Sequence, residues 1–301
     1  MNSTSQIDSS TVFVVSGGAR GITAQCAIRL AREYRCRWIL LGRSPLVEPE
    51  PDWAEGYAQE ADLKKQIMRS LAVQGEKPTP LAVQKLYKKI SASREIRQTL
   101  QALEEAGSQA EYLNADITDI KTLQPQLVAA SERLGPVKGI IHGAGNLADK
   151  LIEKKTPEDF ETVYAAKVTG LENLLTCIPP KQLDYLVLFS SVAGFYGNAG
   201  QTDYAIANEI LNKSAHLIKQ QYPDCHVVSI NWGPWDSGMV TPELKKIFAQ
   251  RQIEVIPIEV GAQLLIEELQ ERHRDAVQVV MESPLMPFTQ RKIGELVGQP
   301  A

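Results

Sequence analysis

The sequence lacks the marks of several protein classes. It has no excess of positive charge, because 32 Lys and Arg stand against 36 Asp and Glu, whereas a nucleic-acid-binding protein shows a basic stripe. No apolar run approaches the ~18 residues needed to cross a membrane, and the polar start MNSTSQIDSS does not fit a signal peptide. The four histidines show no metal-binding spacing. We therefore expect no nucleic-acid partner, no membrane association and no metal site.

Cysteine is also scarce. The four cysteines, Cys26, Cys36, Cys177 and Cys225, are widely scattered, which is typical of reduced thiols in a cytoplasmic protein. Hydrophobic residues make up 44% of the chain, as in globular proteins that bury a full core. The composition therefore predicts a cytoplasmic globular protein.

Short apolar runs alternate with helical patterns along the chain. The runs cover residues 11–16, 36–42, 110–117, 137–145, 185–191, 226–232 and 276–281. This order predicts a parallel sheet covered by helices on both faces, and the continuous apolar pattern fits strands buried on both sides. We predict an α/β fold with a Rossmann-like, doubly wound parallel sheet.

Residues 45–93 interrupt this alternation before the helical pattern REIRQTLQALEEAG. Their first half carries residues at helical spacing, namely Trp53, Tyr57, Lys64, Ile67, Met68 and Leu71. A turn at GEKPTP follows, with Thr79 as N-cap and Pro80 at the first position of a second helix that runs to about Ile90. This helical insertion either covers the sheet edge or forms a docking surface for another domain or subunit.

The stretch VVSGGARGIT follows the first strand and opens a helix, as a dinucleotide-binding loop does. Glycines let the backbone approach a pyrophosphate, and a helix N-terminus offers free N–H groups to it. The candidate residues are Ser16, Gly17, Gly18, Arg20, Gly21 and Ile22. Thr23 stands where a third glycine is usual, which puts helix–strand packing in question more than binding.

The choice between NADH and NADPH depends on the end of the second strand. NAD-preferring folds place an acid there to hold the ribose 2′-OH, but this chain has LLGRS, with Arg43. Arg20 lies inside the glycine loop. Guanidinium forks match phosphate oxygens, so we predict NADPH, the alternative being that one arginine is merely solvated.

The stretch TPEDFETVYAAKVTGLENLL begins with strong helix-start signals, in which Thr156 can cap and Pro157 suits the first turn. Its apolar stripe consists of Phe160, Val163, Lys167, Leu171 and Leu174. Lys167 therefore faces the sheet. A buried amine needs a partner or a function, unless the stem packs and the amine reaches water.

A serine and a tyrosine stand at the spacing typical of a short-chain dehydrogenase/reductase. Ser191 ends the run YLVLFSS, and Tyr204 begins a later helix. Most such enzymes have a lysine four residues after the tyrosine, but here that residue is Asn208. If the two helices pack side by side, Lys167 supplies the missing ammonium, and the set of Lys167, Ser191, Tyr204 and Asn208 is complete.

This exchange, together with SGGARGI, AAKVTGLENLL, FSSVAGFYGNAGQTDYAIAN and NWGPW, resembles the ketoreductase domains of type I polyketide and polyunsaturated fatty acid synthases over residues 11–270. The resemblance implies that the tetrad is catalytic. Further cofactor contacts implied by position are Asp116, Ile117, Gly143, Ala144, Gly145 and Pro234, with Tyr204 and Lys167 also touching the cofactor. Ketoreductase regions of modular synthases usually begin with a second, degenerate Rossmann half, but only about ten residues precede the first strand here. The resemblance therefore implies either an excised catalytic half or a free-standing relative that forms a homodimer. Residues 1–301 are expected to form one NADP-binding reductase domain.

The implied reaction is NADPH-dependent reduction of a 3-ketoacyl thioester, on an acyl carrier protein and beside other synthase domains. Lys167 is expected to lower the pKa of Tyr204. Lys150, Lys154 and Lys155 would guide an acidic carrier, or form a solvated loop. In the family, the side from which the acyl chain enters goes with one of two sequence features. Leu147 and Asp149 match two positions of the motif for one side, and Tyr196 stands where the other side has Trp. The resemblance therefore favours a (3R) product, unless Asp149 only caps a turn. The alternatives are a reductase of small carbonyls and a non-catalytic NADP-binding module.

Overall fold

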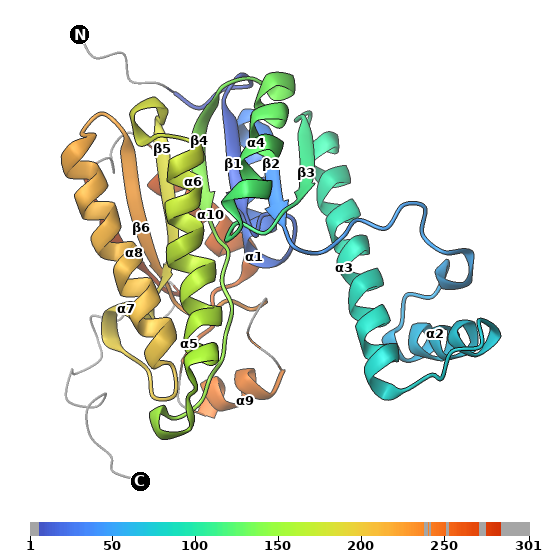
Figure 1. Cartoon of the computed structure of the whole chain (residues 1–301). Coiled ribbons are helices and arrows are strands. Elements are labelled where there is room, and N and C mark those ends of the chain that lie inside the picture. The colour runs from blue at the N-terminus through green and yellow to red at the C-terminus, as the bar shows by residue number, and fades with distance from the viewer. Residues whose placement is uncertain (1–5, 238–239, 241, 251–252, 271–274, 284–301) are drawn as a thin grey trace.

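A parallel sheet forms the centre of the protein. The computed structural model describes residues 6–237, 240, 242–250, 253–270 and 275–283, and these form one seven-stranded sheet in the order β3-β2-β1-β4-β5-β6-β7. The strands are β1 (Val12–Ser16), β2 (Arg37–Gly42), β3 (Ala110–Asn114), β4 (Val137–His142), β5 (Tyr185–Ser191), β6 (His226–Trp232) and β7 (Gln278–Met281). The predicted Rossmann-like architecture is confirmed (Figure 1).

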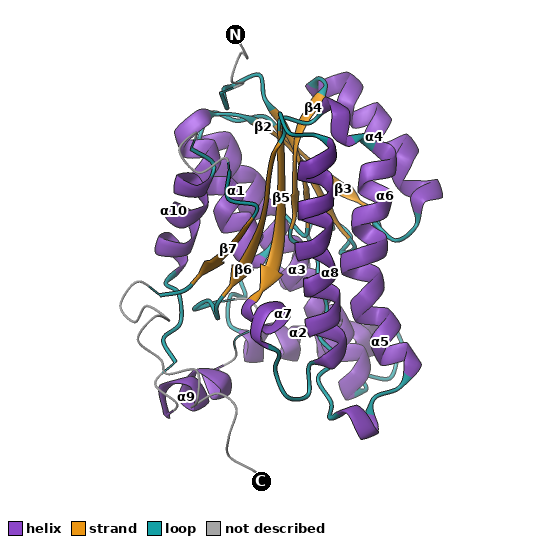
Figure 2. Ribbon diagram, turned by 90° about the vertical axis from the view of Figure 1, so that its left-hand side faces the viewer, coloured by secondary structure: helices purple, strands orange, loops and turns teal. Residues whose placement is uncertain are grey.

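Helices cover both faces of the sheet, as Figure 2 shows. One layer contains α1 (Gly21–Tyr34), α3 (Pro80–Glu105) and α10 (Ile258–Glu268), and the other contains α4 (Ile120–Leu134), α6 (Gly170–Cys177) and α8 (Thr202–Gln221). In β1, Phe13 and Val15 belong to the first core cluster and Val12 and Val14 to the second. Burial on both sides explains why the strands read as continuous apolar runs.

The shorter elements connect this framework. They are η1 (Asp52–Ala54), α2 (Glu60–Val73), η2 (Ile152–Lys154), α5 (Pro157–Tyr164), the π-helical turn η3 (Ala165–Thr169), η4 (Pro180–Gln182), α7 (Val192–Tyr196) and α9 (Pro242–Gln250). The strand order reverses between β1 and β4, which lie side by side in the sheet. In open α/β sheets, ligands bind in the crevice outside the strand ends at such a point.

The insertion has a small core of its own. Leu63, Ile67 and Leu71 of α2 pack with Val83 and Ile90 of α3. In Figure 1, α2 and the first half of α3 stand away from the sheet, whereas the second half of α3 packs on it. Thr79 caps α3 by accepting the Ala82 N–H, with Pro80 in the first turn, as predicted. The part played by the insertion in docking or assembly stays a prediction.

Two details of the insertion differ from the sequence-based expectation. The buried stripe of α2 contains Leu63 and Ile67, whereas Met68 is 46% exposed and Tyr57 precedes the helix. The second helix does not stop near Ile90 but continues as α3 to Glu105. The hydroxyl of Ser93 in mid-helix accepts the Val47 N–H at 2.9 Å. Serine side chains often disfavour a helix interior because they bond to the nearby backbone. Here the hydroxyl bonds to another segment, and the helix continues.

Candidate active site

The four predicted catalytic residues come from three neighbouring elements. Lys167 lies in η3, Ser191 ends β5 and caps α7, and Tyr204 and Asn208 lie on α8. Helix α8 packs against both β5 and η3, as the exchange of lysine and asparagine requires. The structure therefore brings the lysine-bearing turn and the tyrosine-bearing helix together.

Lys167 is almost fully buried. Its side-chain nitrogen donates a hydrogen bond to the carbonyl of Phe189 at 2.8 Å and lies 5.7 Å from the centre of the Tyr204 ring. Burial lowers the pKa of this amine from 10.5 to about 8, because a low-dielectric environment disfavours the charged form. Lys167 therefore faces the interior as expected, and the alternative that its amine reaches water is wrong, since the residue is 3% exposed.

Tyr204 behaves differently from the sequence-based expectation. Burial raises the pKa of its phenol, while hydrogen bonds with Ser191 and Asn208 lower it and the charge of Asp149 raises it. The net direction is upward, whereas a lowering by Lys167 was expected. Burial of the phenol is the largest cause, and the Lys167 ammonium, which is bonded to the carbonyl of Phe189, is not among the groups that shift this pKa.

Asn208 is held by its own helix and by β5. Its amide nitrogen donates to the Tyr204 carbonyl at 2.7 Å, and its backbone carbonyl accepts from the hydroxyl of Ser190 at 3.1 Å. Its side-chain oxygen is buried and has no hydrogen-bond partner among the residues that the structure describes. Buried polar atoms normally have a partner, so this oxygen is suited to hold a small polar molecule.

A buried histidine links the candidate cofactor loop to Lys167. The hydroxyl of Ser16 accepts the Ala144 N–H at 3.2 Å and lies 2.7 Å from Nδ1 of His142, whose Nε2 lies 2.8 Å from the Lys167 carbonyl. Because a carbonyl only accepts, Nε2 carries the proton and Nδ1 accepts from Ser16. Burial, followed by the charge of Lys167, lowers the pKa of His142 to about 3, which keeps the ring neutral. The sequence-based reading of HGAG missed this histidine.

The glycine loop is shaped to receive a phosphate. Gly17 and Gly21 have φ angles of +67° and +61°, and a Cβ at Gly18 would come within 2.5 Å of the Val15 side chain. Helix α1 has no side-chain cap at Arg20 and no acidic residue in its first turn. An uncapped helix N-terminus beside a glycine loop is suited to an anion, so these residues fit a dinucleotide pyrophosphate.

Thr23 is accommodated by a glycine on the facing loop. A Cβ at Gly143 would lie 2.4 Å from the Thr23 hydroxyl oxygen. Gly143 follows β4, where the sequence predicted a cofactor contact. Because Gly143 has no side chain, the larger Thr23 fits at the position where a glycine is usual, and α1 still packs closely on this loop.

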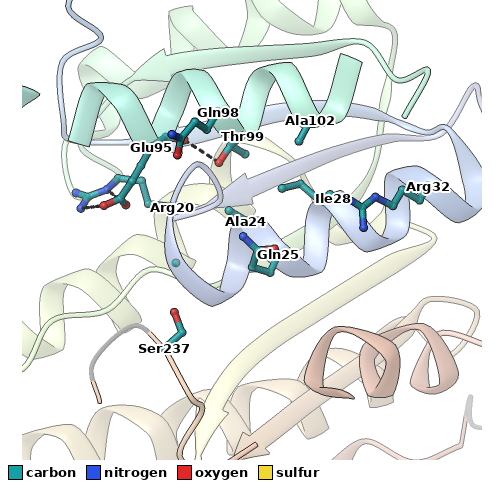
Figure 3. A pocket seen from close by; sticks show the side chains of 11 residues that line it. Arg20, Ala24, Gln25, Ile28, Arg32, Glu95, Gln98, Thr99, Ala102 and Ser237 are labelled. Carbon is teal, nitrogen blue, oxygen red and sulfur yellow. Dashed lines mark hydrogen bonds and ion pairs between the residues drawn. The ribbon is translucent and has the colours of Figure 1, made fainter. Parts of the chain in front are cut away.

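Both predicted 2′-phosphate arginines have protein partners. Arg20 forms a two-pronged ion pair with Glu95 of α3, with an Nε–Oε2 distance of 2.6 Å, and Arg43 donates to the Asn146 side chain at 2.9 Å. Figure 3 shows the Arg20–Glu95 pair at one end of a cavity of about 680 Å³ between α1 and α3. This cavity meets the cofactor loop at Arg20 and Gly21, and none of the four catalytic candidates lines it.

The remaining predicted cofactor residues lie on loops after the strands, apart from Ile22, which is in the first turn of α1. Asp116 accepts both the backbone and the hydroxyl hydrogen of Thr118, so its carboxylate shapes the turn after β3, and Ile117 is buried. The other candidates, Ile22, Gly145 and Pro234, are half-buried. Their contact with a cofactor stays a prediction.

The predicted substrate residues are exposed. Leu147 is 38% and Tyr196 44% exposed, and the Asp149 carboxylate accepts from the Gln201 side chain at 2.8 Å. The loop lysines differ from expectation: Lys155 is buried against Asp203, and Lys150 is paired with Asp159. The three lysines therefore do not form one solvated basic group.

Three features together are typical of a short-chain oxidoreductase: a Rossmann-type sheet, a glycine loop that leads into an uncapped helix, and a cluster of Lys, Ser, Tyr and Asn side chains. The family model described as KR domain matches residues 11–237. The chain therefore belongs to the KR, or ketoreductase, domain family.

Relatives of known identity agree with this assignment. One of the subunits of the polyunsaturated fatty acid synthase of Thraustochytrium sp. is 44% identical over 264 residues, which cover 85% of this chain and 9% of that protein. The 6-methylsalicylic acid synthase of Aspergillus terreus is 30% identical over 229 residues, or 75% of this chain and 11% of that protein. The chain thus spans about a tenth of the length of these two relatives.

Solved structures show the same fold. A ketoreductase domain from the bacillaene assembly line has a TM-score of 0.68 at 26% identity and covers 95% of this chain and 59% of its own. An N-terminal ketoreductase from the macrolactin assembly line has the same TM-score and identity, with coverages of 93% and 46%. In the described part of the chain, no helix has the length and apolarity to cross a membrane, and no three His, Cys, Asp or Glu gather as metal ligands.

Proposed function

We propose that this chain reduces a 3-ketoacyl thioester to a (3R)-3-hydroxyacyl thioester with NADPH. The observation that carries the proposal is the packing of η3 against α8, which brings the buried Lys167 beside Tyr204. The glycine loop at Gly17 and the uncapped N-terminus of α1 support the binding of NADPH. Polyunsaturated fatty acid and polyketide synthases among the relatives support the substrate class.

The residues of the chain have distinct parts in this reaction. NADPH, when bound, supplies the hydride. Tyr204 gives its phenolic proton to the ketone oxygen, and its raised pKa keeps that proton in place at neutral pH. Ser191 hydrogen-bonds the same oxygen and stabilises the charge that develops there. General acid catalysis of this kind contributes roughly 10²- to 10⁴-fold in rate.

Lys167 and Asn208 act after the proton has left. The phenolate that remains on Tyr204 is stabilised by a positive charge nearby, and an amine with a pKa of about 8 is still mostly protonated at neutral pH. Lys167 would also hold the nicotinamide ribose. The buried, unpartnered oxygen of Asn208 would hold a water that returns a proton to Tyr204.

The preference for NADPH rests on Arg20 and Arg43. Their guanidinium groups suit a 2′-phosphate, and no acid stands at the end of β2. The phosphate would compete with Glu95 and Asn146 for these side chains. Equal or faster turnover with NADH would overturn this part.

We infer that the substrate is carried by an acyl carrier protein, beside other synthase domains. Lys150 and Lys154 remain on the surface of the loop after β4 and could attract an acidic carrier, whereas Lys155 is buried and serves a different purpose. The (3R) product follows from Leu147 and Asp149 by resemblance, although Asp149 bonds Gln201 in this structure.

The test is an assay of NADPH oxidation with a short 3-ketoacyl thioester and with a simple ketone, followed by chiral chromatography of the alcohol. The proposal predicts faster turnover of the thioester and a mainly (3R) product. Equal rates on both substrates would favour a reductase of small carbonyls. A racemic or (3S) alcohol would refute the handedness and leave the tetrad intact.

A further inference from the structure

A buried ion pair next to the catalytic tyrosine has no part in the reaction described above. The ammonium of Lys155 lies 2.8 Å from the carboxylate of Asp203, with side chains 7% and 0% exposed. These residues are 48 positions apart in the sequence. Removing charges from water is costly, and a buried ion pair is often no more stabilising than apolar residues of the same size. Its presence beside Tyr204 therefore needs an explanation other than stability.

The Asp203 carboxylate is fixed to the start of the catalytic helix. One of its oxygens accepts the backbone N–H of Tyr204 at 2.8 Å, and the other accepts from Lys155. The N-cap of α8, Gln201, makes no capping hydrogen bond with its side chain. Asp203 thus accepts a first-turn N–H that has no partner within the helix. Its negative charge is also favoured there by the helix dipole.

The Lys155 ammonium extends this connection to the substrate loop. It donates a second hydrogen bond, of 2.8 Å, to the backbone carbonyl of Ala148. Ala148 stands between Leu147 and Asp149, the two residues predicted to orient the acyl chain. It also packs in the same small cluster as the Tyr204 ring.

Further contacts join the same two segments. The backbone N–H of Lys150 donates to the Gly200 carbonyl at 3.0 Å, and the Gln201 side chain donates to Asp149 at 2.8 Å. Those contacts involve exposed residues, whereas the Lys155–Asp203 pair is buried. Water and salt screen buried charges much less than exposed ones. Of these three connections, the pair is the one in which both groups are charged and both side chains are buried.

Lys155 also precedes α5, which continues through η3 to Lys167. A single ammonium thereby connects the start of the catalytic helix, the substrate loop and the helical segment that carries the catalytic lysine. We propose that Lys155 and Asp203 are positioning residues, which hold the loop of residues 147–149 against α8 and so fix the side from which the acyl chain reaches Tyr204. This inference rests on the proposed reduction of a 3-ketoacyl thioester.

The test uses the double variant Lys155→Met/Asp203→Asn. Met has a length similar to that of Lys, and Asn keeps an oxygen for the Tyr204 N–H, so no unpaired buried charge is left. Both bonds of the ammonium, to Asp203 and to the Ala148 carbonyl, are lost, while the bond to the Tyr204 N–H is kept. Lys155→Leu/Asp203→Asn, which likewise leaves no buried charge, serves if the first double variant does not fold. Lys213→Met, which removes an exposed ion pair from the same helix, is the matched control.

Three quantities are measured: KM and kcat with a small 3-ketoacyl thioester, the enantiomeric ratio of the alcohol, and amide hydrogen exchange in residues 147–155. We expect KM to rise more than kcat falls, with a combined loss of roughly 10- to 100-fold in kcat/KM. The product should move towards a racemate, and the Lys150 amide should exchange faster. NADPH affinity and all properties of Lys213→Met should stay those of the wild type.

A purely structural role gives a different result. The double variant would then unfold at lower temperature but keep the wild-type KM and enantiomeric ratio, and this outcome overturns the proposal. Unchanged exchange at Lys150 overturns it as well. If the wild-type protein does not reduce the thioester at all, the proposed function fails, and the exchange rate alone decides whether the pair holds the loop.

Discussion

Replacing Lys167 by Met is expected to change the free energy of unfolding in a pH-dependent way. Relative to the wild type, the variant should be more stable towards urea at neutral pH than at alkaline pH. Lys167 is buried, and its pKa falls from 10.5 to about 8 because burial disfavours the charged amine. Met has a similar length and no charge. The substitution therefore removes the free-energy cost of a buried cation, at the expense of the proposed reaction.

The sign follows from proton binding. Below pH 8 the folded and unfolded states both carry the proton, so the cost of burying the charge is fully present. Between pH 8 and 10.5 only the unfolded state still binds it, and the stability of the wild type rises with pH. At about 1.36 kcal/mol per pKa unit, the change amounts to about 3 kcal/mol. The Phe189 carbonyl loses its donor in the variant at a cost of about 1–3 kcal/mol, which is independent of pH.

Urea unfolding at about pH 7, 8.5 and 10 measures this difference. The stability of Lys167→Met relative to the wild type should fall by about 2–3 kcal/mol between pH 7 and 10. Lys138→Met removes an amine whose side chain is 43% exposed, and should show no comparable trend. A stability difference for Lys167→Met that is constant with pH, or that grows with it, would refute the account of the buried amine.

Three further predictions concern the cofactor, the carrier and the insertion. Arg43→Ala should raise the Kd of NADPH by roughly tenfold and leave that of NADH unchanged, by titration of cofactor fluorescence, because it removes a charge-assisted bond to phosphate; equal effects would remove Arg43 from the 2′-phosphate site. Charge reversal of Lys150 and Lys154 should raise KM for a carrier-bound substrate only, and an equal rise with a small thioester would contradict docking. Replacing residues 48–90 by a short linker should preserve NADPH oxidation with some loss of stability if the insertion covers the sheet edge. Dissociation of an oligomer on a sizing column would instead show that the insertion forms a subunit contact, and an unchanged oligomer would rule that contact out.

The strands were predictable because their environment leaves a simple pattern. A strand buried on both faces needs apolar side chains at successive positions, and the boundaries of β1, β5 and β6 agree with the apolar runs to within one residue. The ends of β3 and β4 did not agree, because the apolar pattern continues past the last ladder hydrogen bond into Ile117 and Ala144, which pack against the core. Packing and pairing stop at different residues there.

The unbroken course of α3 could not be predicted from local preference. The helix was expected to end near Ile90, but it continues, and the hydroxyl of Ser93 bonds the backbone of Val47, which lies close only in the folded chain. The α2 stripe was placed wrongly for a similar reason. Several registers of an amphipathic helix fit the sequence, and the facing residues Val83 and Ile90 select the one that buries Ile67.

The four candidate catalytic residues could be proposed from the sequence because each belongs to a recognisable element, and the exchange of Lys and Asn is implied by the family resemblance. Their electrostatics were not visible. The pKa of Tyr204 depends first on burial and then on hydrogen bonds with Ser191 and Asn208, which only the folded chain shows. His142 and the Lys155–Asp203 pair were missed because their partners are far away in the sequence.

The most direct test of the proposed activity is the rate of NADPH oxidation with a 3-ketoacyl thioester in the wild type and in Tyr204→Phe. Tyr164→Phe is the matched control, because Tyr164 packs in the same small cluster. We predict that Tyr204→Phe binds NADPH but loses at least about 10²-fold in turnover, the range of general acid catalysis, while Tyr164→Phe keeps the wild-type rate. Turnover by Tyr204→Phe at the wild-type rate would contradict the assignment of the proton donor and, with it, the proposed active site.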